Sequence, residues 1–129
     1  MKSNNKKKLL IIDDSHDILD LMEIFLYERY ECYTALNGFE GIKMAKDILP
    51  DIIITDIVMP VIDGIKFLNN IKSEEKTAKI PVIALTSFTK KKNIKSLLSC
   101  GFCAVITKPF VRDSIIETIE KSLYQTKTN

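Results

Sequence analysis

The sequence predicts an α/β fold, in which five parallel strands form a doubly wound sheet with helices on both faces. Three observations support this prediction. Short apolar runs rich in β-branched residues recur along the chain, amphipathic stretches lie between them, and turn or capping residues stand where one pattern gives way to the other. The 129 residues suffice for one domain but not for an eight-unit barrel or a two-domain enzyme.

The first part of the chain alternates strand and helix patterns twice. The run 9–12 is a strand candidate covered on both faces, and apolar residues three or four positions apart predict a helix over 18–26. The weaker run 32–35 is typical of an edge strand. A second helix is expected over 39–45, after the turn or capping pair Asn37-Gly38.

The middle of the chain repeats the alternation. The run 52–55 reads Ile-Ile-Ile-Thr and predicts a strand buried on both faces. Apolar spacing predicts a helix over 65–71, which the pair Asp63-Gly64 precedes. Pro81 then stands immediately before the next apolar run, 82–85.

The last third completes the pattern with a helix over 94–98, a short strand at 104–106 and a helix over 115–123. Strands that alternate with helices in this way form parallel sheets with crossover connections. We expect one domain over residues 9–125, a disordered basic tail at 1–8 and a frayed end at 126–129.

Composition excludes several classes of protein. No apolar run reaches the roughly 18 residues that a membrane span needs, and a signal peptide is not expected. The three cysteines are an odd number, so we interpret them as free thiols of a cytoplasmic protein. The net charge of +2 is too small to indicate nucleic acid or membrane binding by itself.

The distribution of charge is uneven. Fourteen of the 17 acidic residues lie between Asp13 and Glu75, whereas the stretch 76–112 has eight basic residues and no acidic one. This basic stretch is either a solvated lysine-rich face or a docking surface for an acidic protein partner. Direct nucleic-acid binding is the weaker alternative, because no recognition-helix motif is present.

Polar side chains follow four of the expected strands. These residues are Asp13-Asp14, Asp56, Thr86 and Lys108. Ligands of open parallel sheets bind outside the carboxyl ends of the strands, so we expect these side chains to meet. Three carboxylates beside one ammonium leave a net negative site, and an all-oxygen donor set with room for water favours Mg²⁺.

A metal beside a carboxylate, a hydroxyl and a lysine suits phosphoryl transfer. Asp56 is the expected nucleophile, since a carboxylate can accept a phosphoryl group to form an acyl phosphate. Lys108 would screen the repulsion between the anions, and Thr86 would donate a hydrogen bond to a phosphoryl oxygen.

With these motifs in this order, the chain resembles the receiver domains of bacterial two-component response regulators over about residues 8–125. The matching segments are Asp13-Asp14, 56–64, Thr86 and Lys108-Pro109-Phe110. The resemblance implies a flavodoxin-like fold with strand order 2-1-3-4-5. It also implies a phosphorelay switch rather than a conventional enzyme, with a histidine kinase or histidine phosphotransfer protein as phosphoryl donor to Asp56.

The same resemblance assigns the metal ligands. Asp14 would bind Mg²⁺ directly and Asp13 largely through water, together with Asp56 and the backbone carbonyl of Val58. The Lys108–Pro109 peptide bond would be cis.

Phosphorylation would alter affinity for a downstream protein, or for an output domain removed after Asn129. The expected docking face comprises the helix over 94–98, the strand at 104–106 and the helix over 115–123.

Some positions depart from the family pattern. Val105 stands where an aromatic residue is common, so a rotating aromatic ring cannot report phosphorylation there. Gly41 lies within an expected helix, at a cost of about 1 kcal/mol relative to alanine. Val58 and Phe88 occupy the two variable positions beside the site; neither side chain can orient a water, which predicts slow self-dephosphorylation.

The sequence leaves three alternatives to a phosphorylated switch. A pseudo-receiver would dock without phosphorylation, although the whole set of acidic, hydroxyl and lysine residues is retained. An aspartate-nucleophile phosphatase of the haloacid-dehalogenase type would need D-x-D after the first strand, where Asp13-Asp14 stands. A nucleotide or flavin binder would need a glycine-rich phosphate loop, and no such motif is present.

Two further features have simple explanations. The spacing of Cys100 and Cys103 matches a redox motif, but the pair follows a helix, where the dipole opposes thiolate formation. The single histidine, His16, is expected to be a solvated residue in the loop after the acidic pair.

Overall fold

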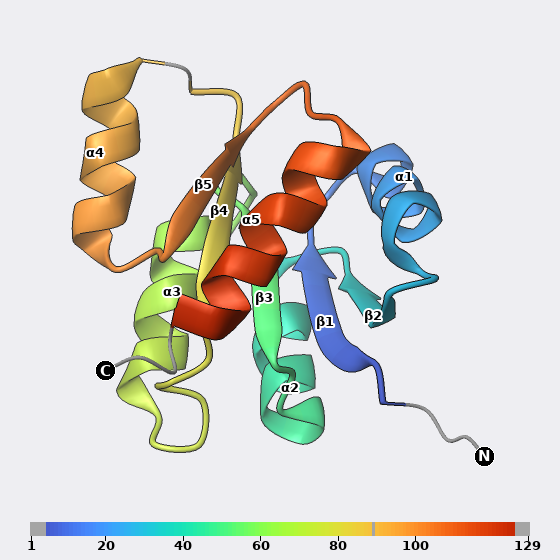
Figure 1. Ribbon diagram of the computed structural model, residues 1–129. Helices are drawn as coiled ribbons and strands as arrows, with labels where there is room; N and C mark the ends of the chain where they lie inside the picture. Colours follow the sequence, from blue (N-terminus) through green and yellow to red (C-terminus); the bar gives the residue numbers. More distant parts are fainter. Residues whose placement is uncertain (1–4, 89, 126–129) are drawn as a thin grey trace.

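Five parallel strands form one sheet in the order β2-β1-β3-β4-β5 (Figure 1). The computed structural model describes residues 5–88 and 90–125. The strands are β1 (Lys7–Ile12), β2 (Tyr30–Ala35), β3 (Ile52–Asp56), β4 (Val82–Thr86) and β5 (Ala104–Thr107). The predicted α/β fold and its strand order are therefore confirmed.

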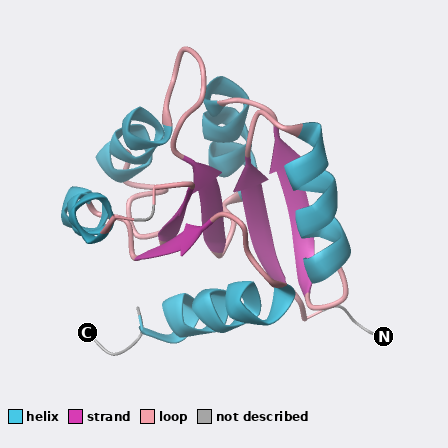
Figure 2. Cartoon of the chain, turned by 90° about the horizontal axis from the view of Figure 1, so that it is seen from above, coloured by secondary structure: helices cyan, strands magenta, loops and turns pink. Residues whose placement is uncertain are grey.

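Helices cover both faces of the sheet, as the view along the strands shows (Figure 2). One face carries α1 (His16–Leu26) and α5 (Arg112–Gln125). The other carries α2 (Gly38–Ile48), α3 (Gly64–Ser73) and α4 (Lys91–Cys100). Each parallel strand is thus followed by a helix, and the two helical layers bury the sheet between them.

The central strands have no polar alternation because both of their faces are buried. In β1, Leu9 and Ile11 pack toward α1 and α5, whereas Leu10 and Ile12 pack toward α2 and α3. All four are fully buried. Successive side chains of a strand point to opposite faces of the sheet, so one apolar run contributes to two hydrophobic cores.

Several boundaries differ from the sequence-based expectation. Strand β1 begins at Lys7, so the segment expected as a tail over 1–8 contributes its last two residues to the sheet; residues 1–4 and 126–129 lie outside the described residues. Pairing of Lys7 with Tyr30 also extends β2 by two residues. His16 is exposed, but it is the first residue of α1 rather than part of a loop.

Three helices begin with a side-chain cap. Ser15, Asn37 and Asp63 accept hydrogen bonds from the N–H groups of Ile18, Glu40 and Lys66, respectively. These caps satisfy backbone donors that have no partner within the helix. Helix α4 differs, because its N-cap residue Lys90 makes no such hydrogen bond.

The cysteines are free thiols in the structure. Burial raises the pKa of the Cys103 thiol, which disfavours the reactive thiolate and agrees with the non-redox interpretation of this position. Among the described residues, no helix is long and apolar enough to span a membrane.

Gly64 allows α3 to begin directly against the end of β3. A Cβ atom at this position would lie 2.5 Å from the backbone oxygen of Asp56 and 2.9 Å from the Cα atom of Ile57. Gly41 faces a softer neighbour, since its Cβ atom would lie 2.6 Å from the Cδ1 atom of Ile12, at the end of a flexible side chain. The glycine within α2 thus serves close packing against the sheet.

We expect Gly64→Ala to lower the free energy of unfolding by about 2 to 3 kcal/mol, because backbone atoms must move to make room. Gly41→Ala is the matched control, where a gain of about 1 kcal/mol in helix propensity offsets the shift of Ile12. Urea unfolding of both variants tests the ranking. A smaller loss for Gly64→Ala than for Gly41→Ala would contradict it.

Candidate functional site

Three carboxylates meet at the carboxyl edge of the sheet. Asp13 and Asp14 follow β1, and Asp56 is the last residue of the neighbouring strand β3. One oxygen from each side chain lies within 4.8 Å of the others. Asp13 and Asp56 are buried, whereas Asp14 is exposed and opens the cluster to solvent.

Lys108 supplies the positive charge of the site. Its Nζ atom lies 3.3 Å from Oδ2 of Asp13 and 3.4 Å from Oδ1 of Asp56. The backbone N–H of Lys108 donates to the carbonyl of Thr86, which ties the loop after β5 to β4. One ammonium therefore bridges two carboxylates that follow adjacent strands.

The buried carboxylates keep unused capacity to accept a ligand. Oδ1 of Asp13 accepts the Ser15 N–H, but its buried Oδ2 has no hydrogen-bond partner among the described residues, only the nearby Lys108 ammonium. Burial, and then the neighbouring Asp13 charge, raise the pKa of the Asp56 carboxyl, and Lys108 opposes this shift in part. A buried carboxylate oxygen that accepts no hydrogen bond, within an all-oxygen donor set, fits a hard divalent cation such as Mg²⁺.

Thr86 ends β4 beside this cluster and is almost fully buried. Its hydroxyl oxygen accepts the N–H of Phe88, which fixes the start of the next loop. The side chain of Phe88 is partly exposed at the rim, with 39% of its surface accessible. Thr86 thus lies on the strand adjacent to Asp56, as the sequence predicted.

The loop after Asp56 has an unusual backbone. The Ile62 N–H donates to the Pro60 carbonyl across Val61, whose φ is 68°. This hydrogen bond closes a γ-turn with Val61 at its centre. The positive φ of such a turn costs a β-branched residue about 1 to 3 kcal/mol. Val58 lies between Asp56 and this turn in the chain, and 64% of its surface is exposed.

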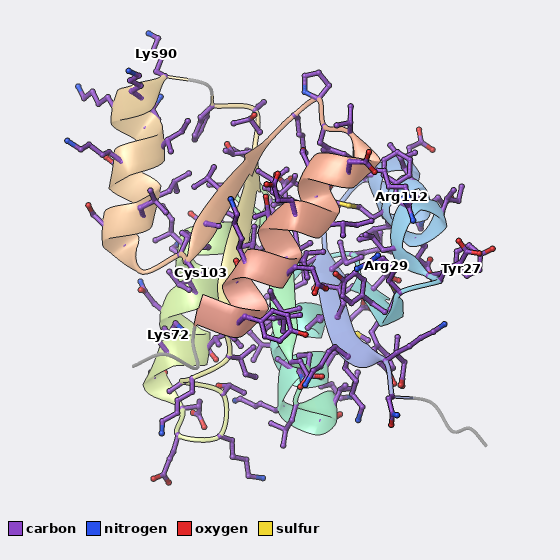
Figure 3. The ribbon with its side chains drawn as sticks, viewed as in Figure 1. Tyr27, Arg29, Lys72, Lys90, Cys103 and Arg112 are labelled. Carbon is purple, nitrogen blue, oxygen red and sulfur yellow. The ribbon has the colours of Figure 1, made fainter. Side chains whose placement is uncertain are left out.

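The loop that carries Lys108 also contacts α1. The Lys108–Pro109 peptide bond is cis, which confirms the prediction. The ring of Phe110 packs edge-on against Phe25, with centroids 6.4 Å apart, and Nε of Arg112 donates to the Phe25 carbonyl (Figure 3). The described residues that follow Lys108 thus contact α1 through one ring pair, from Phe110, and one hydrogen bond, from the first residue of α5.

Comparison with known proteins places this site in a family. The family model for the response regulator receiver domain matches residues 9–120. The chain belongs to the response regulator receiver domain family. Receiver domains are signalling modules of two-component systems, and the family interacts with histidine kinases and downstream targets.

Relatives of this receiver domain include chemotaxis proteins. The chain is 36% identical over 118 residues to the chemotaxis protein CheY of Halobacterium salinarum, covering 91% of this chain and 97% of that protein. The structure of CheY4 from Vibrio cholerae superimposes with a TM-score of 0.86 and 27% identity, covering 92% of this chain and 99% of CheY4.

A third match shares the fold. The receiver domain of the sensor histidine kinase PA1611 from Pseudomonas aeruginosa has a TM-score of 0.84 and 23% identity, with coverage of 92% and 98% of the two chains. That crystal structure has a magnesium ion coordinated in its active-site cleft.

The receiver fold brings together the side chains that the sequence singled out at separate strand ends, namely Asp13, Asp14, Asp56 and Lys108. Sequence reasoning missed the backbone donors of the site, which are the N–H groups of Ser15 and Ile57. A serine just before an amphipathic stretch is a common helix N-cap, a signal that could have located Ser15 but not the bond from its own N–H to Asp13.

The raised pKa of Asp56 predicts how the apo protein responds to pH. The folded state binds a proton here more tightly than the unfolded chain, so the ionised carboxylate lowers stability above its raised pKa. In EDTA, we expect Asp56→Asn to have a higher urea midpoint than the native protein at pH 7. The difference should shrink as the pH approaches the ordinary carboxyl pKa of about 4.

Asp47→Asn, at an exposed position of α2, is the control and should leave the midpoint nearly unchanged. Mg²⁺ should raise the midpoint of the native protein more than that of Asp56→Asn, because a ligand stabilises the state that binds it. A lower urea midpoint for Asp56→Asn than for the native protein, at pH 7 without metal, would contradict the argument that ionised Asp56 destabilises the folded state.

Proposed function

We propose that this receiver domain accepts a phosphoryl group from a partner's phosphohistidine onto Asp56. The juxtaposition of three carboxylates within 4.8 Å with the Lys108 ammonium supports this proposal most directly. Phosphoryl transfer needs an aligned nucleophile and positive charge around the transferred group rather than much covalent chemistry. The site offers both at the end of β3.

The two oxygens of Asp56 have different surroundings. Oδ1 accepts the Ile57 N–H at 3.0 Å and lies near Lys108, whereas Oδ2 accepts no hydrogen bond from the described residues and is the oxygen left for the attack. In the proposed step an Asp56 oxygen forms a bond to phosphorus as the phosphorus–nitrogen bond of phosphohistidine breaks. The imidazole keeps the electron pair of that bond and takes a proton from solvent.

Asp13, Asp14, Asp56 and the backbone carbonyl of Val58 are the proposed Mg²⁺ ligands. Oδ2 of Asp13, which accepts no hydrogen bond from the described residues, supports this assignment, as does the magnesium ion in the PA1611 receiver. When bound, the metal supplies positive charge that offsets repulsion between the carboxylates and the phosphoryl oxygens. Lys108 holds a phosphoryl oxygen in the proposed complex, and the Thr86 hydroxyl donates to another.

The proposed consequence of phosphorylation is a changed affinity for a downstream protein at the face formed by α4, β5 and α5. On α4, a shallow hollow combines Lys91, Lys92 and Lys95 with the apolar side chains of Ile94 and Leu98. A basic rim around apolar groups suits an acidic amphipathic segment of a partner. Val105 is partly buried in β5, so this face has to respond without an aromatic switch at that position.

Acetyl phosphate or phosphoramidate with Mg²⁺ tests the proposed phosphorylation. We expect intact-mass spectrometry to show one added phosphoryl group on the native protein, none on Asp56→Asn and none in EDTA. Lys108→Ala and Thr86→Ala should lower the yield, because each removes a proposed donor to the phosphoryl group. An unmodified native protein that still binds Mg²⁺ would instead support a pseudo-receiver that docks without phosphorylation.

The exposed apolar residues beside the site predict slow loss of the phosphoryl group. Neither Val58 nor Phe88 can hydrogen-bond an attacking water. We expect Val58→Asn to shorten the phosphoryl lifetime several-fold, measured by intact mass after removal of the donor. Val61→Asn, at an exposed position of the same loop, should have little effect, and a lifetime of seconds for the native protein would refute the prediction.

A further inference from the structure

A second cleft lies at the amino-terminal edge of the sheet, opposite the carboxylate cluster. It has a volume of about 270 Å³ and is formed by the start of β1, the loop before β3, the loop between α3 and β4, and the last turn of α5. In Figure 1 these segments lie at the lower ends of the strands, whereas the strand arrows point toward the opposite, carboxyl edge of the sheet. Its volume is near the lower end of the range for small-molecule sites, about 300 to 1,000 Å³.

Three lysines give this cleft its charge. Lys7, Lys76 and Lys79 line it, and none of them pairs with a carboxylate within 4.0 Å among the described residues. Among the described residues that line the cleft, Asp51 is the one acidic residue. Its carboxylate already accepts the Lys8 N–H at 2.8 Å, and its own N–H donates to the Lys8 carbonyl. Within the described part of the chain, the cleft therefore has a net positive charge.

The wall that carries Lys76 and Lys79 is held in place before any ligand arrives. Between these two lysines, the fully buried Thr77 donates its hydroxyl hydrogen to the Ile71 carbonyl at 2.7 Å. The Lys72 ammonium, at the lower end of α3 in Figure 3, donates to the carbonyls of Ala78 and Ile80 at 3.1 Å. A loop fixed in this way loses little conformational freedom on binding.

The cleft also has apolar and aromatic lining residues, of which Leu123 and Tyr124 come from α5 rather than from the elements that carry the lysines. Ile80, Pro81 and Leu123 provide hydrocarbon surface, and Tyr124 adds a ring that is half exposed. The carboxyl end of α5 has partial negative charge, so a phosphate is favoured on the lysine side and an uncharged ring on the side of Tyr124. The lining thus offers both kinds of group that a nucleotide needs, cations for its phosphate and an aromatic ring for its base.

We propose that this cleft binds a nucleoside monophosphate, with the phosphate among Lys7, Lys76 and Lys79 and the base against Tyr124 and Ile80. Lysine ammonium groups bind phosphate through charge-assisted hydrogen bonds. Stacking of a base on an aromatic ring adds further affinity with little dependence on which base is bound. The site is separate from Asp56, so this proposal stands or falls independently of the phosphorylation chemistry.

Isothermal titration calorimetry of the full chain with AMP, GMP, CMP and UMP tests the proposal. Inorganic phosphate and adenosine are the comparison probes. We expect at least one nucleotide to bind tenfold or more tightly than either probe, because only a nucleotide occupies both sides of the cleft. If inorganic phosphate binds as tightly as every nucleotide, the cleft is only a region of positive potential and the proposal fails.

Variants locate the binding. The double variant Lys76→Gln/Lys79→Gln should weaken nucleotide binding at least tenfold, whereas Lys91→Gln/Lys92→Gln, which removes the same charge from α4, should not. Tyr124→Leu should weaken nucleotide binding and leave that of inorganic phosphate unchanged. Equal losses in the two double variants would overturn the proposal. Circular dichroism and urea unfolding establish that each variant is folded, and these measurements do not depend on Asp56.

Discussion

Electrostatic repulsion at one edge of the sheet is the constraint around which the site is organised. Parallel strands β1 and β3 place Asp13 and Asp56 side by side, and burial removes the water that would screen them. Lys108 offsets part of this repulsion by contacting both carboxylates. The hydrophobic packing on both faces of the sheet holds the groups together, and the remaining negative charge favours binding of a cation.

Much of this arrangement could be predicted from sequence because it follows from topology. Once the apolar runs ending at Ile12, Thr55 and Leu85 are identified as parallel strands, the polar residues after them must share an edge. Parallel topology is therefore the reason that Asp13, Asp56 and Lys108 lie where the sequence predicted them. Predicting these positions required no knowledge of side-chain packing.

The remaining features depend on contacts between distant segments, which local patterns do not encode. The closeness of Gly64 to the Asp56 backbone and of Gly41 to Ile12 arises only when helices dock on the sheet. The positive φ of Val61 contradicts the preference of a β-branched residue, so no propensity could predict it. Lys7 belongs to β1 because it pairs with Tyr30 of β2. A charged residue in a basic stretch gave no local indication of a strand.

Helix α4 begins in an electrostatically unfavourable way. Lys90 provides no side-chain cap, Lys91 and Lys92 follow it, and the first turn contains no acidic residue to balance the positive end of the helix dipole. Mutual repulsion and the dipole both act against this turn, and dissolved salt screens both effects. The order of the first turn of α4 is therefore coupled to the ionic strength of the surrounding medium, whereas the capped starts of α1, α2 and α3 are anchored by the chain itself.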